Sequence, residues 1–201
     1  MGKTLIKIGP VDQGRRMSLH EFDEAEVQEG YVYELSRGII TVVDVPKGLH
    51  ALQLIAVRRQ LSAYDFLHPG RVMGIMGSME CQLLIGDLES ERHPDVAIYL
   101  SPPPDVKRKD FWSIWIPEIV IEIVSPSSRK RDYEEKPAEY LELGVREYWI
   151  VDGPKRLMLV MRRTRGGWAE RTIRPPVLYR TRLLPGLEFS CGAVFAAAGL
   201  E

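Results

Sequence analysis

The sequence lacks the features of secreted and membrane proteins. Only two cysteines occur among its 201 residues; they are far apart and match no metal-ligand spacing. A disulfide framework is therefore not expected, and two free thiols in a reducing compartment are the default. No run approaches the ~20 apolar residues of a membrane span, and the first apolar segment is too short for a signal peptide. We expect a cytoplasmic protein without a membrane span.

An excess of charge of either sign is also missing, as are the common catalytic motifs. The net charge is -1, so no overall field attracts nucleic acid. Nucleic-acid contact would need a local basic patch, and residues 107–109 and 129–131 are two candidate clusters. The segment "GIMGS" at 74–78 lacks the phosphate-loop spacing. No G-x-S-x-G elbow is present. The composition does not identify a reaction.

What is present fits one α/β domain, without repeats or a linker. We treat residues 1–16 as an N-terminal leader and 17–201 as the domain. Ser18 and Glu21 form a capping-box pattern at the start of a short helix. A hairpin over 31–45 and a helix between 46 and 69 follow. Shorter β-rich runs are predicted at 72–75, 81–85 and 96–100.

The second half predicts a strand–helix–strand unit. Residues 117–124 and 145–151 are nearly continuous apolar runs, which is typical of strands covered on both faces. The helix between them ends at Gly144, a suitable residue after a helix, and Pro137 should lie near its start or kink it. The two strands should be parallel. A hairpin turning at Gly166-Gly167 follows, then a final strand and a small apolar cap.

Three acidic residues occur where surface placement does not explain them. Glu122 interrupts the apolar run "IVIEIV", Asp95 follows a proline at the start of a predicted strand, and Glu34 lies in the first hairpin. Burying an unpaired carboxylate is unfavourable by several kcal/mol, roughly, or forces it to bind a proton. If the strands of Asp95 and Glu122 are neighbours, a divalent cation could neutralise both, and Mg²⁺ favours such oxygen ligands.

The helix after Glu122 carries two further candidates, Lys136 and Tyr140, one turn apart. A lysine there could orient a water molecule or offset charge on a phosphate. Each residue also has an ordinary interpretation. The acids could be paired with arginines, Lys136 could be a solvated helix residue, and Tyr140 a core aromatic.

The segments "YELSRGII", "HPDVAIYL", "IPEIVIEIVSPSSRKRDYEEKPAEYLELGVREYWIVD" and "LPGLEF" together resemble a known family. They are similar to the Uma-two family of restriction endonucleases, a bacterial branch of the PD-(D/E)XK nuclease superfamily. The resemblance extends over most of residues 17–195. It implies a restriction-endonuclease-like mixed β-sheet flanked by helices, with a metal site at one edge of the sheet.

The resemblance also assigns site residues. Asp95 matches the aspartate of the "PD" motif and Glu122 the acid of the "(D/E)XK" motif. The superfamily lysine would fall at position 124, which is valine here, and the lysine that this branch carries on the following helix matches Lys136. Glu34 matches the N-terminal acid, and Tyr140 matches the tyrosine after the helix lysine.

The implied function is Mg²⁺- or Mn²⁺-dependent hydrolysis of phosphodiester bonds in DNA. The metal ligands would be Asp95, Glu122 and the carbonyl of Ile123. Two alternatives stay open: a catalytically silent member that binds DNA or protein, and a structural acid pair in an unrelated protein. Because cutting both strands of a duplex uses two sites, we expect a homodimer. The tail from Gly192, with Trp112 and Trp115, is the candidate exposed apolar surface for it.

Overall fold

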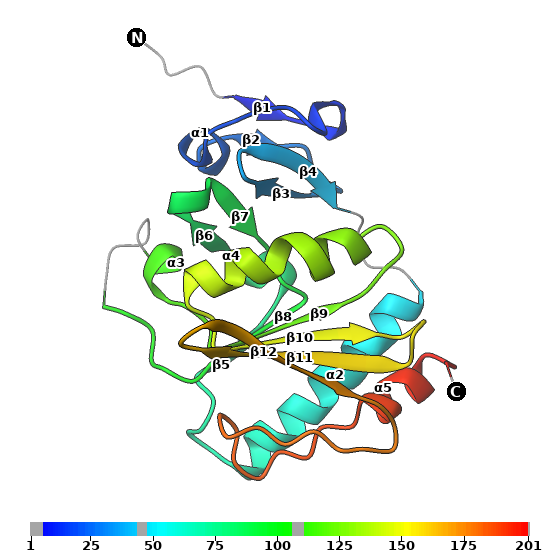
Figure 1. Ribbon diagram of the computed structural model, residues 1–201. Coiled ribbons are helices and arrows are strands. Elements are labelled where there is room, and N and C mark those ends of the chain that lie inside the picture. Colours follow the sequence, from blue (N-terminus) through cyan, green and yellow to red (C-terminus); the bar gives the residue numbers. More distant parts are fainter. Residues whose placement is uncertain (1–5, 44–47, 106–110, 201) are drawn as a thin grey trace.

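A central six-stranded sheet organises the fold (Figure 1). The computed structural model describes residues 6–43, 48–105 and 111–200. The strand order of this sheet is β12-β11-β10-β9-β8-β5, and all neighbours are antiparallel except β9 and β10, which are parallel. The parallel strand–helix–strand unit is therefore confirmed. The strands are β5 (Gly74–Met76), β8 (Val96–Tyr99), β9 (Ile119–Ile123), β10 (Glu147–Asp152), β11 (Leu157–Thr164) and β12 (Gly167–Ile173).

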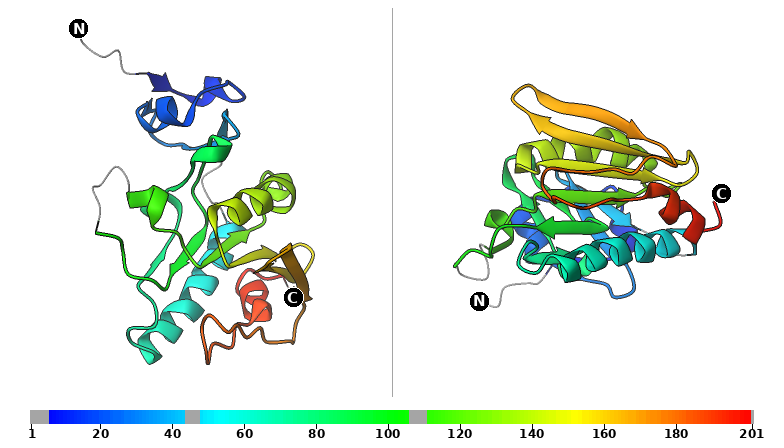
Figure 2. Two further views of the ribbon diagram at one scale, coloured as in Figure 1. Left: turned by 60° about the vertical axis from the view of Figure 1, so that its left-hand side comes forward. Right: turned by 90° about the horizontal axis from the view of Figure 1, so that it is seen from below.

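Helices cover both faces of this sheet (Figure 2). On one face lie α2 (Leu49–Leu67) and α5 (Cys191–Ala197); on the other lies α4 (Lys136–Leu143). Because side chains alternate along a strand, Ile121 of β9 packs toward α2 and Val120 toward α4. Glu122 has the same parity as Val120 and therefore faces α4.

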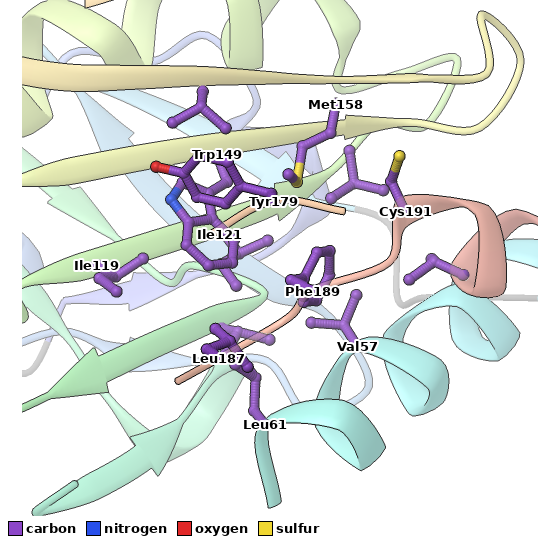
Figure 3. Packing of buried hydrophobic residues seen from close by; sticks show 14 of the residues in the cluster. Val57, Leu61, Ile119, Ile121, Trp149, Met158, Tyr179, Leu187, Phe189 and Cys191 are labelled. Carbon is purple, nitrogen blue, oxygen red and sulfur yellow. The ribbon is translucent and has the colours of Figure 1, made fainter. Parts of the chain in front are cut away.

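The larger core lies under α2 and α5 (Figure 3). The Trp149 ring meets Tyr179 edge to face with centroids 5.1 Å apart and lies 5.3 Å from Phe189. The expected final strand is wrong: within the described residues, the tail before α5 makes only an isolated bridge between Tyr179 and Phe189. Prolines at 175, 176 and 185 supply no N–H donors for a regular ladder.

The apolar surface expected for a dimer is mostly buried. In α5, Val194 and Phe195 contact the core, and Trp115 is buried against Tyr99 with ring centroids 4.0 Å apart. Trp112 is half-buried in the same aromatic group. These side chains supply core packing in the monomer, so they do not support the predicted homodimer, which stays a prediction.

A four-stranded sheet lies on the far side of α4 (Figure 1), with the order β4-β3-β7-β6. Tyr140 of α4 packs with Leu83 of β6 as well as with Val120. The polar sequence Ser-Glu-Arg of β7 gave no strand signal, although all three side chains are buried. The strands are β3 (Val32–Ser36), β4 (Ile39–Val43), β6 (Leu83–Ile85) and β7 (Ser90–Arg92).

The N-terminal segment is packed from residue 6 onward, unlike the expected leader. Strand β1 (Lys7–Ile8) pairs in parallel with β2 (Glu26–Val27), and Ile8 is buried beside Phe22 and Tyr33. Helix α1 (Leu19–Asp23) begins with the expected capping box of Ser18 and Glu21. Short 3-10 turns lie at Pro10–Asp12, Ser78–Glu80 and Gly86–Leu88, and α3 spans Phe111–Ile114.

Helix α4 has an irregular start. Residues Arg131–Glu135 form one π-helical turn, and α4 continues from Lys136 with Pro137 at its second position. Proline has no N–H, and the carbonyl of Asp132, five residues before Pro137, accepts a hydrogen bond from the Tyr148 hydroxyl at 2.9 Å instead. Gly144 ends the helix with φ of 106°, as expected. No helix in the described ranges is long and apolar enough to cross a bilayer.

Candidate active site

Glu122 faces the first turns of α4. Its Oε1 atom accepts a hydrogen bond from the Tyr140 hydroxyl at 2.6 Å and forms an ion pair with Lys136 Nζ at 2.9 Å. Lys136 and Tyr140 are four residues apart on one helix face, which lets both reach the same carboxylate oxygen. The structure thus brings together three of the predicted site residues, all of them buried.

Lys136 is surrounded by carboxylates. Its Nζ atom lies 3.2 Å from Asp132 Oδ1 and 4.0 Å from Glu34 Oε1, in addition to Glu122. Asp132 lies one turn earlier, in the π-helical segment, and accepts a hydrogen bond from Ser128 Oγ at 2.6 Å. One ammonium group therefore offsets the charge of three buried carboxylates.

The pKa values follow from this imbalance. Burial raises the pKa of Glu122 to about 8, and the nearby carboxylates of Asp95 and Asp132 add to the effect of burial against the opposing charge of Lys136. Burial alone would lower the pKa of Lys136, but Glu122, Glu34 and Asp132 outweigh it and hold that pKa above its usual value. Lys136 thus stays protonated, while Glu122 is the carboxylate whose charge is least compensated.

Asp95 lies immediately before β8, at the end of the sheet that also holds Glu122. Val96 pairs with Ile121, so the chain positions of Asp95 and Glu122 adjoin across the antiparallel strands. Asp95 Oδ2 accepts a hydrogen bond from the Ile123 amide at 2.7 Å and lies 3.1 Å from His50 Nε2. The neighbouring strands are confirmed, and we predict that the two carboxylates lie within about 6 Å of each other, a distance that one bridging ion can span.

Glu34 is held by a second buried network. Arg92 NH1 donates to Glu34 Oε2 at 2.9 Å, and Arg92 Nε donates to Glu139 Oε2 at 2.6 Å. Burial alone would raise the pKa of Glu34, but Lys136 and Arg92 lower it to about 2. Because Glu34 belongs to β3 and Glu139 to α4, these ion pairs join the four-stranded sheet to the site.

A pocket of about 610 Å³ opens onto this cluster. Asp95, Glu122, Ile123, Lys136 and Glu34 all line it. Tyr140 is fully buried behind Glu122 and supports that carboxylate from the interior. Other lining residues include His50, Arg131 and the loop residues Ser125, Pro126, Ser127 and Ser128. The pocket is large enough for a phosphate group with its ions and water.

Sequence reasoning missed three residues of this region. Asp132 stands in the strongly charged segment "SRKRDYEEK", which is typical of a solvated helix; its spacing of four from Lys136 was the available signal. His50 begins a helix with no partner nearby in sequence, and burial alone would lower its pKa, but Asp95 raises it. Arg92 is the counter-charge of Glu34, and no local pattern connects two residues 58 positions apart.

The basic cluster at 129–131 is only partly available for an anion. Arg129 forms two hydrogen bonds with Asp152, at 2.6 and 3.0 Å, so its guanidinium already has a carboxylate partner. Lys130 is exposed and Arg131 lines the pocket. The other cluster, 107–109, lies outside the described residues.

The fold and the site define a class: a mixed sheet flanked by helices, with carboxylates at the ends of two adjacent strands and a lysine beside them, as in nuclease folds. The profile of the Uma2 family, described as "Putative restriction endonuclease", matches residues 19–194, and the chain belongs to this family. The family assignment supports a nuclease function. A comparison with curated proteins found no match.

A solved structure shares the fold. It is from Anabaena variabilis ATCC 29413 and is described as a putative nuclease belonging to DUF820. The TM-score is 0.72 with 18% sequence identity, over 90% of this chain and 99% of that chain. The restriction-endonuclease-like fold predicted from the resemblance is therefore confirmed.

Proposed function

We propose that this protein hydrolyses phosphodiester bonds in DNA with the help of a divalent cation, Mg²⁺ or Mn²⁺. The observation that carries the proposal is the crowding of Glu122, Asp95 and Asp132 around one ammonium group, in a pocket open enough for a phosphate. Such a concentration of carboxylates is relieved by a bound cation.

The residues present fit a hard cation. Within the described part of the chain, no hydrogen bond involves Glu122 Oε2 or Asp95 Oδ1, while the other oxygen of each carboxylate is held in place. No group of three His, Cys, Asp or Glu side chains could hold a metal ion in the described ranges. Two carboxylates plus the Ile123 carbonyl remain, and Mg²⁺ characteristically takes one or two carboxylates and keeps several waters. A bound cation of this kind polarises a phosphate and acidifies a coordinated water.

The chain's own residues have distinct roles in this proposal. Tyr140 and Lys136 fix one oxygen of Glu122, and His50 and the Ile123 amide fix one oxygen of Asp95. Lys136, whose pKa is raised, acts as a permanent cation and hydrogen-bond donor toward the phosphate rather than as a base.

A plasmid-nicking assay with Mg²⁺ or Mn²⁺, against a chelator control, tests the proposal. Glu122→Gln and Asp95→Asn should abolish nicking while the protein still unfolds in a cooperative transition, because both substitutions are isosteric. Glu142→Gln, at an exposed position of α4 that lines neither this pocket nor another described hollow, is the matched control and should nick normally. Full activity of Glu122→Gln, or activity in chelator, would refute the proposal.

The homodimer remains part of the proposal, because double-strand cleavage uses two active sites. Light scattering across micromolar protein concentrations tests it. A monomer mass throughout that range would contradict it.

A further inference from the structure

A second large hollow lies at the opposite end of the central strands from the carboxylate pocket. Its volume is about 1160 Å³, and it lies between the outer strands β10–β12 and the segment 179–183. Glu147, at the start of β10, lines this hollow, whereas Asp152 ends β10 near the carboxylate pocket. Five residue steps along a strand correspond to ~17 Å. The two hollows are therefore separate sites.

Arginine dominates the lining of this hollow. Five exposed arginines line it and have no carboxylate within 4.0 Å among the described residues. They are Arg146, Arg162, Arg165, Arg171 and Arg182. In a chain of net charge -1, this is a strong local concentration of positive charge. We refer to the hollow as the arginine groove.

The sheet register places arginines on the wall of the groove. Val160 pairs with Arg171, and Arg162 lies two residues beyond Val160 on the same face of β11. Val160 belongs to the core beneath the 179–189 segment, so Arg162 and Arg171 project on that side of the sheet. Arg182 approaches from the segment itself, which makes the opposite wall.

A buried carboxylate fixes the second wall. Glu147 accepts hydrogen bonds from Trp149 Nε1 at 3.0 Å, Tyr179 OH at 3.0 Å and Thr181 Oγ1 at 2.7 Å. The three donors satisfy Glu147 inside the protein and hold the segment on both sides of Arg180 against the sheet. The groove is therefore preformed, and Glu147 is not available to pair with its arginines.

We propose that the arginine groove binds the phosphodiester backbone of nucleic acid, as a second contact surface remote from the cleavage site. Guanidinium groups bind phosphate oxygens in bidentate geometry, and several on two facing walls suit a chain of regularly spaced phosphates. The choice of nucleic acid over another polyanion rests on the proposed nuclease function. At ~3.4 Å per phosphate of one strand, the two sites are ~5 nucleotides apart or more.

The salt dependence of DNA binding tests this proposal. The variant Arg162→Ala/Arg171→Ala/Arg182→Ala is compared with Arg16→Ala/Arg59→Ala/Arg71→Ala, which removes the same charge from exposed positions outside the groove. Anisotropy of a labelled duplex is measured without metal, so that no cleavage occurs. The slope of log K against log salt should fall by up to about 0.9 per lost contact in the groove variant and stay nearly unchanged in the control.

Hydrolysis is measured separately, with Mn²⁺ and bis(p-nitrophenyl) phosphate, which is too small to reach both sites. The groove variant should hydrolyse it at the wild-type rate. If the wild-type protein and both variants fail to hydrolyse this substrate, the proposed nuclease function fails. The salt slope of DNA binding then still decides the groove proposal. An unchanged slope, or an equal fall in the control, would overturn the groove proposal. The groove proposal would also be overturned if the groove variant lost affinity for polyglutamate but kept its affinity for DNA. That result would identify an acidic protein as the partner.

Discussion

Removing Lys136 should destabilise the protein strongly and in a pH-dependent way. In Lys136→Met, the buried carboxylates of Glu122 and Asp132 lose a cation at 2.9 and 3.2 Å. At an effective dielectric constant of ~20, each of these contacts is worth about 5 kcal/mol. Deleting Lys136 also removes its own desolvation penalty of several kcal/mol, so the net loss should be about 3–5 kcal/mol when the carboxylates are ionised.

The sign of the pH dependence follows from the raised pKa of Glu122. A carboxyl whose pKa rises on folding, here from 4.5 to about 8, favours the folded state below the unfolded value, and this contribution is lost as the pH rises through the folded value. Without the Lys136 cation, the stability lost when Glu122 ionises is larger. The destabilisation should therefore be smaller near about pH 5, where folded Glu122 is protonated and Glu34 is still ionised, and full near about pH 9.

Urea unfolding, monitored by tryptophan fluorescence, measures the free energy of unfolding at both pH values. Lys130→Met is the matched control, because Lys130 is exposed and makes no ion pair among the described residues. A Lys136→Met variant as stable as this control near about pH 9 would refute the electrostatic reasoning. A loss of the same size at both pH values would instead indicate a packing defect.

Three further predictions concern the metal, the backbone beside Asp95 and the core. Mn²⁺ affinity should rise with pH through the pKa of Glu122, because binding displaces its proton; calorimetry in buffers of different ionisation enthalpy should detect proton release. Gly77→Ala should unfold at lower temperature, because its Cβ would lie 2.0 Å from the Asp95 carbonyl oxygen, whereas Gly86→Ala, with open space, should not. Phe189→Ala should lose about 3–5 kcal/mol in urea unfolding, and a loss under about 1 kcal/mol would contradict the packing in Figure 3.

The sequence predicted the strand and the acid that matter most, because Glu122 violates an otherwise apolar pattern. It also predicted the parallel neighbour of that strand, since two continuous apolar runs around one helix leave few other arrangements. Lys136 was a candidate from its position on the helix after Glu122, and the resemblance matched it to the lysine that this branch carries there. Asp132 and Arg92 escaped notice because their burial depends on tertiary contacts, and charged residues in a polar segment look solvated until the chain has folded.

The tail shows the converse limit. Its apolar composition was read as exposed surface because no periodic pattern assigned it a partner in the sequence. Val194 and Phe195 are in fact covered by contacts with residues more than a hundred positions away, such as Val57. Local patterns identify which side chains avoid water, and only the topology determines what covers them.

The ion pairs of Arg92 have a consequence for how the molecule unfolds. Arg92 and Glu34 belong to the four-stranded sheet, whereas Glu139 and Lys136 belong to α4 on the central sheet. Opening the four-stranded sheet alone would separate Arg92 from Glu139 and Glu34 from Lys136, and would also break the apolar contact of Leu83 with Tyr140. Local opening of β3 and β7 is therefore coupled to the loss of contacts on α4. Their amide protons should exchange together with those of β9 and β10, as one cooperative unit.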